Sequence, residues 1–175
     1  AKVEPKVETS KVETAKIEPN IENAKFEHKI LKNSLYNKAN QSAKFKNYDL
    51  AIKFYKESIE KEKNPKSAYN LALLYEDLDN NNDAITYYKI ACDKKVQKSF
   101  TNLGLLYYHQ NKYEQAEYYL KTPIKNGDVD NYYTYARILE KLDKKEDAFK
   151  YLQYHLMLKK ATKFEKKMFS RLVRE

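Results

Sequence analysis

The residues best suited to chemistry are one cysteine and three histidines, and their positions form no reactive or metal-binding pattern. Cys92 is the only cysteine, so the chain has neither an internal disulfide nor a CxxC motif. His28, His109 and His155 are far apart in the sequence and lack the spacing of metal ligands. The two glycines form no glycine-rich loop of the kind that holds a phosphate. The sequence therefore predicts a non-enzymatic protein with no catalytic residues, no metal site and no cofactor.

Small residues recur instead, in pairs twelve positions apart. Each pair follows the previous one by 33, 32 and 32 residues, and the four pairs are Ala39/Ala51, Ala72/Ala84, Gly104/Ala116 and Ala136/Ala148. Self-similarity at this period is typical of stacked helix-turn-helix units. A small residue is needed where two helix backbones approach closely, because a larger side chain would force them apart.

Apolar residues lie at helical spacing around both members of each pair, and no stretch alternates as a half-buried strand would. Polar clusters such as 79–82, 110–112 and 143–145 separate the two stripes and contain Asn or Asp, which favour turns and helix N-caps. Cys92 occupies the place of Ile59 and Ile124, which predicts a buried small hydrophobe. His155 replaces a small residue on an inner face, and we expect a hydrogen-bonded or partly exposed histidine. Pro123 should end or kink its helix early.

These residues resemble the tetratricopeptide repeat (TPR) family, whose unit of about 34 residues carries small residues, a Tyr and a Leu at these offsets. The resemblance implies an all-α fold, a right-handed α-solenoid of four TPR-like repeats plus a C-terminal capping helix. We expect the repeats within 29–160, at about 31–64, 65–96, 97–128 and 129–160. In this family the repeats bind other proteins, which implies an interaction scaffold or adaptor.

In TPR proteins the first helix of each unit lines a concave groove. Carried onto this sequence, the resemblance implies partner-binding residues at Tyr36, Asn40, Lys66, Tyr69, Asn70, Leu73, Lys98, Thr101, Asn102, Leu105, Tyr108, Tyr133 and Arg137, with Glu140 beside them. Some family members hold a C-terminal carboxylate with a clamp of Lys, Asn, Asn, Lys and Arg. Asn40, Asn70 and Lys98 match three of these positions, whereas Tyr36 and Asn102 replace two of the three cations, which weakens carboxylate capture. Alternatively, Asn70 and Asn102 serve only to satisfy the backbone between units.

Residues 161–175 form a predicted basic amphipathic helix. Thr162 and Glu165 have the spacing of a capping box, and Phe164, Met168 and Leu172 make an apolar stripe over the following turns. Repeat arrays need a terminal cap, so we interpret this helix as a lid on the last repeat. Docking on a partner is the alternative.

Residues 1–28 form a predicted low-complexity linker of Lys, Val, Glu and Pro, repeating a Lys-apolar-Glu motif about every five residues. Such tethers resemble those of bacterial envelope proteins, so a periplasmic or membrane-tethered location is slightly favoured over a cytoplasmic one. We expect no membrane insertion by this stretch, and its composition is compatible with an anchor upstream of Ala1.

The net charge of +9 comes from the repeats and favours an acidic partner. The main hypothesis is a scaffold that binds an extended peptide or a partner helix in a groove lined by Tyr, Asn and Lys. A structural subunit that self-associates as a homo-oligomer is the first alternative. Nucleic-acid binding is the weaker alternative, because the lysines are scattered and interleaved with acidic residues.

Overall fold

The computed structural model describes residues 34–158 and 162–173, and all the regular structure in this part of the chain is helical. The predicted linker at 1–28 lies outside the described residues, as do His28 and the start of the predicted first repeat. Among the helices that are described, none combines the length and the apolar character needed to cross a membrane.

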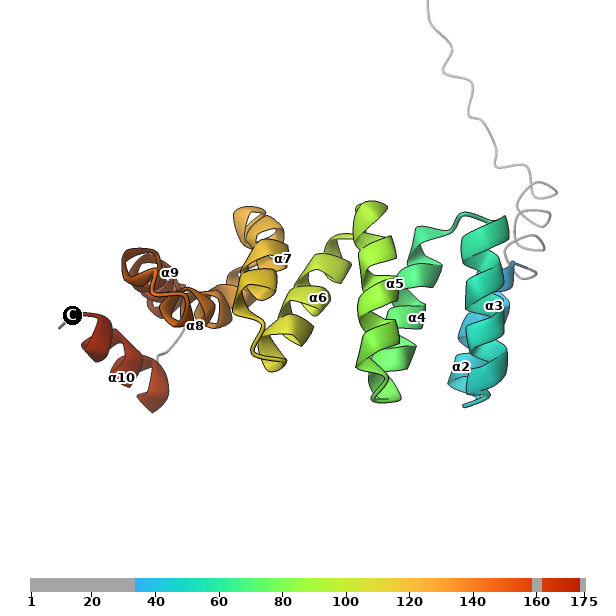
Figure 1. Ribbon diagram of the computed structural model, residues 1–175, viewed down its shortest axis with the longest axis horizontal. Helices are drawn as coiled ribbons and strands as arrows, with labels where there is room; N and C mark the ends of the chain where they lie inside the picture. Colours follow the sequence, from blue (N-terminus) through green and yellow to red (C-terminus); the bar gives the residue numbers. More distant parts are fainter. Residues whose placement is uncertain (1–33, 159–161, 174–175) are drawn as a thin grey trace, which may run out of the picture. The chain divides into compact units, whose positions relative to one another are not determined.

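Eight of the helices form four antiparallel pairs, which follow one another from α2 and α3 to α8 and α9 (Figure 1). The first helices of the pairs are α2 (Leu35–Lys44), α4 (Pro65–Asp77), α6 (Gln97–His109) and α8 (Tyr132–Lys141); the second helices are α3 (Tyr48–Lys61), α5 (Asn81–Asp93), α7 (Tyr113–Lys125) and α9 (Lys145–Leu158). A short 3₁₀ helix, η1 (Val129–Asn131), precedes α8, and α10 (Lys163–Leu172) follows α9. Each second helix of the first three pairs also contacts the first helix of the next pair.

The small residues lie where the helices of each pair meet, as the sequence predicted. The seven alanines of the four pairs are fully buried, and so is Gly104 in its helix. Methyl groups at these points let larger residues from the neighbouring helices fill the interior: Tyr88, Leu103, Leu120 and Leu152 have no exposed surface. Interior packing of this kind repeats from pair to pair, which confirms the all-helical repeat fold.

The turns share one conformation. In the described part of the chain, a residue in the left-handed region follows each of the helices α2 to α8; Gly127 is the one glycine among them, and the others are Lys46, Lys63, Asp79, Lys95, Asn111 and Asp143. After α5, for example, the Lys95 N–H donates to the Cys92 carbonyl and the Val96 N–H to the Ala91 carbonyl. These bonds form the Schellman motif, which satisfies the last carbonyl groups of a helix.

Asparagine residues occupy the N-cap positions of several helices, as expected for polar turns. The Asn47 and Asn80 side chains accept hydrogen bonds from the backbone N–H groups of Leu50 and Asp83. Lys112 occupies the equivalent position before α7 and makes no such bond. Side-chain capping is therefore used in some repeats and not in others.

The prediction that Pro123 ends its helix early is wrong. α7 continues to Lys125, the position equivalent to the end of α5 at Asp93. Pro123 lies in the last turn and is buried, so its ring removes only one backbone donor near a helix end. The Asn126 N–H then closes the turn onto the Thr122 and Pro123 carbonyls.

α10 packs on α8 and α9, the two helices of the last repeat. Met168 is buried with Ala136 and Leu152, and the Phe169 ring stacks on Phe149 with their centroids 5.1 Å apart. The capping box is present: the Glu165 N–H donates to the Thr162 hydroxyl, and the Thr162 N–H donates to the Glu165 carboxylate. The prediction that Phe164 belongs to the apolar stripe of α10 was wrong, because Phe164 is 79% exposed. α10 turns Met168 inward and leaves Phe164 outside.

Candidate functional site

The predicted binding residues all lie on first helices, and none of them is fully buried. α2 carries Tyr36 and Asn40, α4 carries Lys66, Tyr69, Asn70 and Leu73, α6 carries Lys98, Thr101, Asn102, Leu105 and Tyr108, and α8 carries Tyr133 and Arg137. We call this set the first-helix row. Its lysines and Arg137 are exposed and its tyrosines are half-buried, so the row combines apolar ring surface with positive charge.

Hydrogen bonds join the row between the first and second repeats. The Asn70 amide donates to the Asn40 side-chain oxygen at 3.0 Å and to the Tyr36 hydroxyl at 3.2 Å. Tyr55 of α3 donates its hydroxyl to the same Asn40 oxygen at 2.6 Å. Asn40 and Asn70 thus bond to each other, so part of their hydrogen-bonding capacity is already used within the protein.

The same arrangement recurs one repeat later. The Asn102 amide donates to the Tyr88 hydroxyl at 3.1 Å and to the Tyr69 hydroxyl at 3.5 Å. Tyr88 in turn donates to the Glu76 carboxylate at 2.6 Å. Burial raises the pKa of Tyr88, and the neighbouring Glu76 carboxylate raises it further. Asn70 and Asn102 therefore bond to side chains of the preceding repeat, whereas the alternative prediction gave them backbone partners.

Arg137 connects the third and fourth repeats through aromatic rings. Its guanidinium carbon lies 5.6 Å from the ring centroid of Tyr108 and 5.9 Å from that of Tyr133. Both distances fall in the range of cation–π contacts. The residues of the row that the sequence predicted are thus brought together pairwise across each repeat boundary.

The remaining members of the row make fewer side-chain contacts. Thr101 donates to the Asp128 carboxylate at 3.1 Å, beside a hollow lined by Lys98 and Pro123. Leu73 and Leu105 pack against the core with part of their surface exposed. The exposed lysines Lys66 and Lys98 stand at equivalent places in the first turns of α4 and α6. Lys66 and Lys98 form no side-chain hydrogen bond or ion pair among the described residues, so these two positions can change without disturbing the contacts between repeats.

Cys92 and His155, which were considered for chemistry, have surroundings that suit a structural role. Cys92 is buried, as predicted, and burial raises the pKa of its thiol to about 12, which keeps it protonated. His155 is also buried, with its Nε2 atom 2.9 Å from the Glu165 carboxylate and its ring against Tyr133. Within the described ranges, no three His, Cys, Asp or Glu residues are grouped to hold a metal ion.

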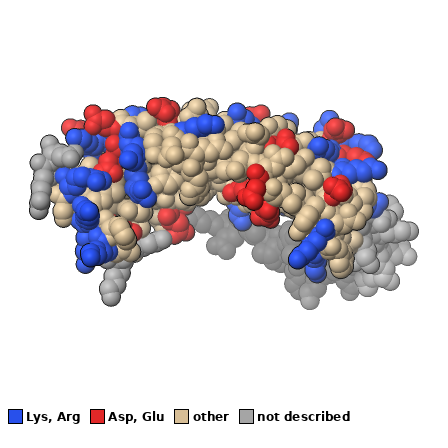
Figure 2. Space-filling model, turned by 60° about the horizontal axis from the view of Figure 1, so that its bottom comes forward, with Lys and Arg blue, Asp and Glu red and all other residues tan. Residues whose placement is uncertain are grey.

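Charge on the surface is mixed in sign. On the face drawn in Figure 2, blue Lys and Arg side chains alternate with red Asp and Glu side chains among broad areas of other residues. Several of the acidic groups are paired; for example, Lys144 bonds both carboxylate oxygens of Glu117, at 2.7 and 2.6 Å. Among the described residues on the face that Figure 2 draws, no continuous basic track runs along the molecule.

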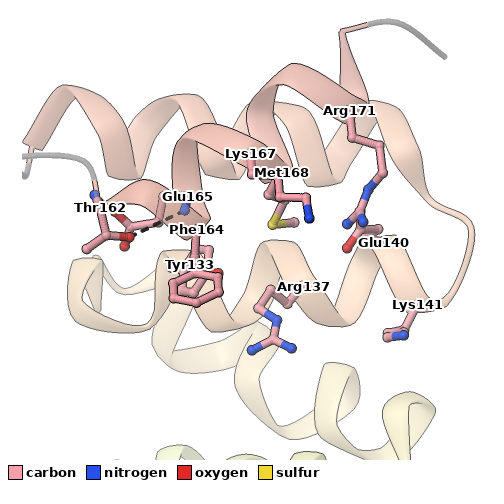
Figure 3. A pocket seen from close by; sticks show the side chains of 10 residues that line it. All are labelled: Tyr133, Arg137, Glu140, Lys141, Thr162, Phe164, Glu165, Lys167, Met168 and Arg171. Carbon is pink, nitrogen blue, oxygen red and sulfur yellow. Dashed lines mark hydrogen bonds and ion pairs between the residues drawn. The ribbon is translucent and has the colours of Figure 1, made fainter.

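Sequence reasoning missed part of the surface next to α8. A pocket lies between α8 and α10, lined by Arg137 and Tyr133 of the row and by residues of α10 (Figure 3). The basic character of α10 was visible in the sequence, but its contact with α8 was not. The i, i+4 spacing of Arg137 and Lys141 gives one signal, since both residues face the same side of α8.

The fold and the row define a helical-repeat protein with a partly exposed aromatic and cationic surface along its first helices. A family model described as a tetratricopeptide repeat matches residues 65–93, which comprise α4 and α5. Residues 65–93 thus match one tetratricopeptide repeat, and the described helices have the fold of tetratricopeptide repeat proteins.

Solved structures of the same fold include a MamA crystal form labelled AMB-1, with 16% identity, a TM-score of 0.68 and coverage of 83% of this chain and 82% of that one. PilF of Pseudomonas aeruginosa has 17% identity and a TM-score of 0.61, over 80% of this chain and 66% of that one. Cut9, from a hetero-tetramer with Hcn1, has 16% identity and a TM-score of 0.55, over 77% of this chain and 28% of that one. No curated protein matches the sequence.

Proposed function

We propose that this protein is a scaffold that binds an extended segment or a helix of another protein along the first-helix row. The observation that carries the proposal is that every residue of the row retains exposed surface, whereas Ala68, Leu103 and Ala136 of the same helices are buried. Side chains such as Tyr69, Leu73 and Tyr108 offer apolar area, and Lys66 and Lys98 offer charge. Half-buried tyrosines are well suited to this use, because their rings are held in place before a partner arrives.

The hydrogen bonds within the row support this proposal physically. Asn70 bonds to Asn40 and Asn102 bonds to Tyr69, so hydrogen bonds join successive first helices and fix the spacing of the row before binding. A surface held in place in this way loses less conformational entropy when a partner binds. An envelope location for the complex is a further proposal, which the composition of residues 1–28 supports by analogy alone.

Lys66 and Lys98 give the sharpest test, because these two exposed row residues carry no side-chain hydrogen bond or ion pair among the described residues. The double variant Lys66→Glu with Lys98→Glu should abolish pull-down of a partner from cells that contain the protein. The matched control is Lys89→Glu with Lys121→Glu, which places the same charge change on exposed positions of α5 and α7. Circular dichroism should give equal helicity for both variants. Partner capture that survives in the row variant would count against the proposal.

Self-association is a second candidate, and one observation favours it. Tyr154, Met157 and Leu158 share one face of α9 and are 42%, 82% and 59% exposed. An exposed apolar face at the end of a repeat array can pair with a second copy. Sedimentation at several concentrations distinguishes the two candidates, because a strict monomer at high concentration excludes self-association.

A further inference from the structure

The pocket between α8 and α10 has a volume of about 700 Å³ and is open to solvent. Figure 3 shows Arg137 and Lys141 extending from α8, and Lys167 and Met168 extending from α10. Tyr133 completes the wall on the α8 side. This pocket continues the first-helix row, because Tyr133 and Arg137 belong to both.

Both carboxylates that line the pocket already have partners. Glu140 forms an ion pair with Arg171, which fixes α10 to α8. Glu165 bonds the His155 ring at 2.9 Å and accepts the Thr162 N–H at 2.6 Å. Neither carboxylate is therefore available to neutralise the other cations of the pocket.

Three cations of the pocket have no carboxylate partner in the described part of the chain: Arg137, Lys141 and Lys167. Arg137 is the most firmly held of them, because the rings of Tyr108 and Tyr133 lie within cation–π distance of its guanidinium. The guanidinium is planar, and its N–H groups can bind a carboxylate with two parallel hydrogen bonds. The pocket is thus prepared for negative charge.

An apolar contact lies beside this charge. Phe164 is 79% exposed although it lies in α10 one turn before Met168, which is 5% exposed. Both residues line the pocket. An exposed phenylalanine next to unpaired cations fits a segment that carries an apolar side chain among acidic ones.

We propose that this pocket binds an acidic segment of a partner protein, with carboxylates on Arg137, Lys141 and Lys167 and an apolar side chain on Phe164. The proposal rests on the proposed scaffold function and names the chemistry of the partner at the α10 end of the row. It differs from carboxylate capture by the predicted clamp, whose matching positions Asn40, Asn70 and Lys98 lie in the first three repeats.

Fluorescence anisotropy with synthetic peptides tests the proposal on the full chain. The probe is a fluorescein-labelled peptide of sequence EEDLFEED. Two companions separate charge from apolar contact: QQNLFQQN has the same shape without charge, and EEDGSEED has the charge without the apolar residues. We expect the first peptide to bind about tenfold or more tightly than either companion, because QQNLFQQN loses the charge-assisted hydrogen bonds and EEDGSEED loses the apolar contact with Phe164.

Charge reversal at the pocket, Arg137→Glu with Lys167→Glu, should weaken binding of EEDLFEED about tenfold or more. Lys89→Glu with Lys121→Glu, which changes the net charge equally, should leave the affinity close to that of the unaltered chain. Should the pocket variant lose helicity, Lys141→Gln with Lys167→Gln replaces it, with a smaller loss expected. Arg137→Lys separates charge from geometry and should lose affinity because a lysine cannot bind a carboxylate with two bonds.

Three results would overturn the proposal: equal binding of the neutral peptide, equal losses in the pocket and control variants, or no binding by the unaltered chain. Preferential binding of a single-stranded RNA 20-mer or of phosphatidylglycerol vesicles at the same residues would also overturn it. Failure here with continued dependence of partner pull-down on Lys66 and Lys98 would leave the scaffold function standing. Loss of both would reject both proposals.

Discussion

The Nε2 atom of His155 lies 2.9 Å from the Glu165 carboxylate, and this contact joins α9 to α10 inside the protein. Both residues are buried, with 6% of His155 and 8% of Glu165 exposed. Glu165 also completes the capping box with Thr162, so one carboxylate starts α10 and attaches it to the last repeat. Because α10 forms one wall of the pocket, this pair sets the position of the α10 residues proposed to bind the partner.

Glu165 should make the stability of the C-terminal end depend on pH. Burial alone raises the pKa of its carboxyl, but hydrogen bonds from the Thr162 N–H and from His155 outweigh burial and lower that pKa overall. A carboxyl with a lowered pKa stabilises the fold above its unfolded pKa of about 4.3, and this contribution is lost as the pH falls through the folded value. The melting temperature of the protein should therefore exceed that of Glu165→Gln at pH 7. This difference should shrink as the pH is lowered to 3.

The variant Glu114→Gln, at an exposed carboxylate in the first turn of α7, controls for the general loss of one negative charge. A constant difference in melting temperature between the protein and Glu165→Gln at every pH would contradict the account of the buried pair.

Gly104→Ala should destabilise the protein although alanine favours helix. A Cβ atom on Gly104 would lie 2.5 Å from Cγ of Leu120 and 3.2 Å from its backbone nitrogen. Overpacking costs about 1–3 kcal/mol, and the helix propensity of alanine recovers about 1 kcal/mol. We expect a net loss of about 1 kcal/mol in the free energy of unfolding, measured in urea. Adding Leu120→Ala should give a double variant less destabilised than the two single changes together. A Gly104→Ala variant more stable than the protein would contradict this prediction, because it would show that α6 and α7 can accommodate the added methyl group.

Lys95→Gly should stabilise the protein. Lys95 has a φ of 60° after α5, a conformation that costs a residue with a side chain about 1–2 kcal/mol. Glycine removes that cost and loses about 0.5–1 kcal/mol to its greater freedom in the unfolded chain, so a gain of up to about 1 kcal/mol remains. The neighbouring Lys94 has a φ of −90°, so Lys94→Gly should destabilise. Equal effects of the two substitutions on the urea midpoint would contradict the assignment of strain to Lys95.

Asn102 and Tyr88 should be energetically coupled. Asn102→Ala removes the 3.1 Å hydrogen bond to the Tyr88 hydroxyl and should cost about 1 kcal/mol. Combining it with Tyr88→Phe should give a total that departs from additivity by at least about 0.5 kcal/mol. Asn102→Ala with Asn70→Ala is the control, because Asn70 bonds in a different repeat boundary, and these two effects should add. Additivity in both pairs would show that the Asn102 contact contributes little.

The repeat fold was accessible from sequence because it depends on residue size at a fixed spacing. Ala39, Ala51, Ala72 and the equivalent positions must be small wherever two helices touch, and this requirement leaves a regular mark on the sequence. The first-helix row was implied by the resemblance to tetratricopeptide repeats, carried onto the same register. Its role in partner binding remains a prediction, because the structure shows only where its side chains lie.

The pocket and the buried pair His155 and Glu165 could not be predicted from the sequence, because both depend on how α10 packs. His155 and Glu165 come from two helices joined by a turn, and only the packing of α10 brings them within 2.9 Å. The apolar stripe of α10 also failed at Phe164, since spacing alone does not show which edge of a stripe faces the neighbouring helix. The prediction that Pro123 ends its helix early failed because the effect of a proline depends on its distance from the helix end.

Site-specific photo-crosslinking tests the central claim, that the first helices carry the partner, most directly. Benzoylphenylalanine placed at Lys66, Lys98 or Arg137 samples exposed positions of α4, α6 and α8, and placement at Lys89 or Tyr118 samples exposed positions of α5 and α7. After irradiation in cells that contain the protein, mass spectrometry should identify one common partner from the three first-helix positions and none from the two second-helix positions. Crosslinks of that partner to Lys89 or Tyr118, with none from the first helices, would contradict the account.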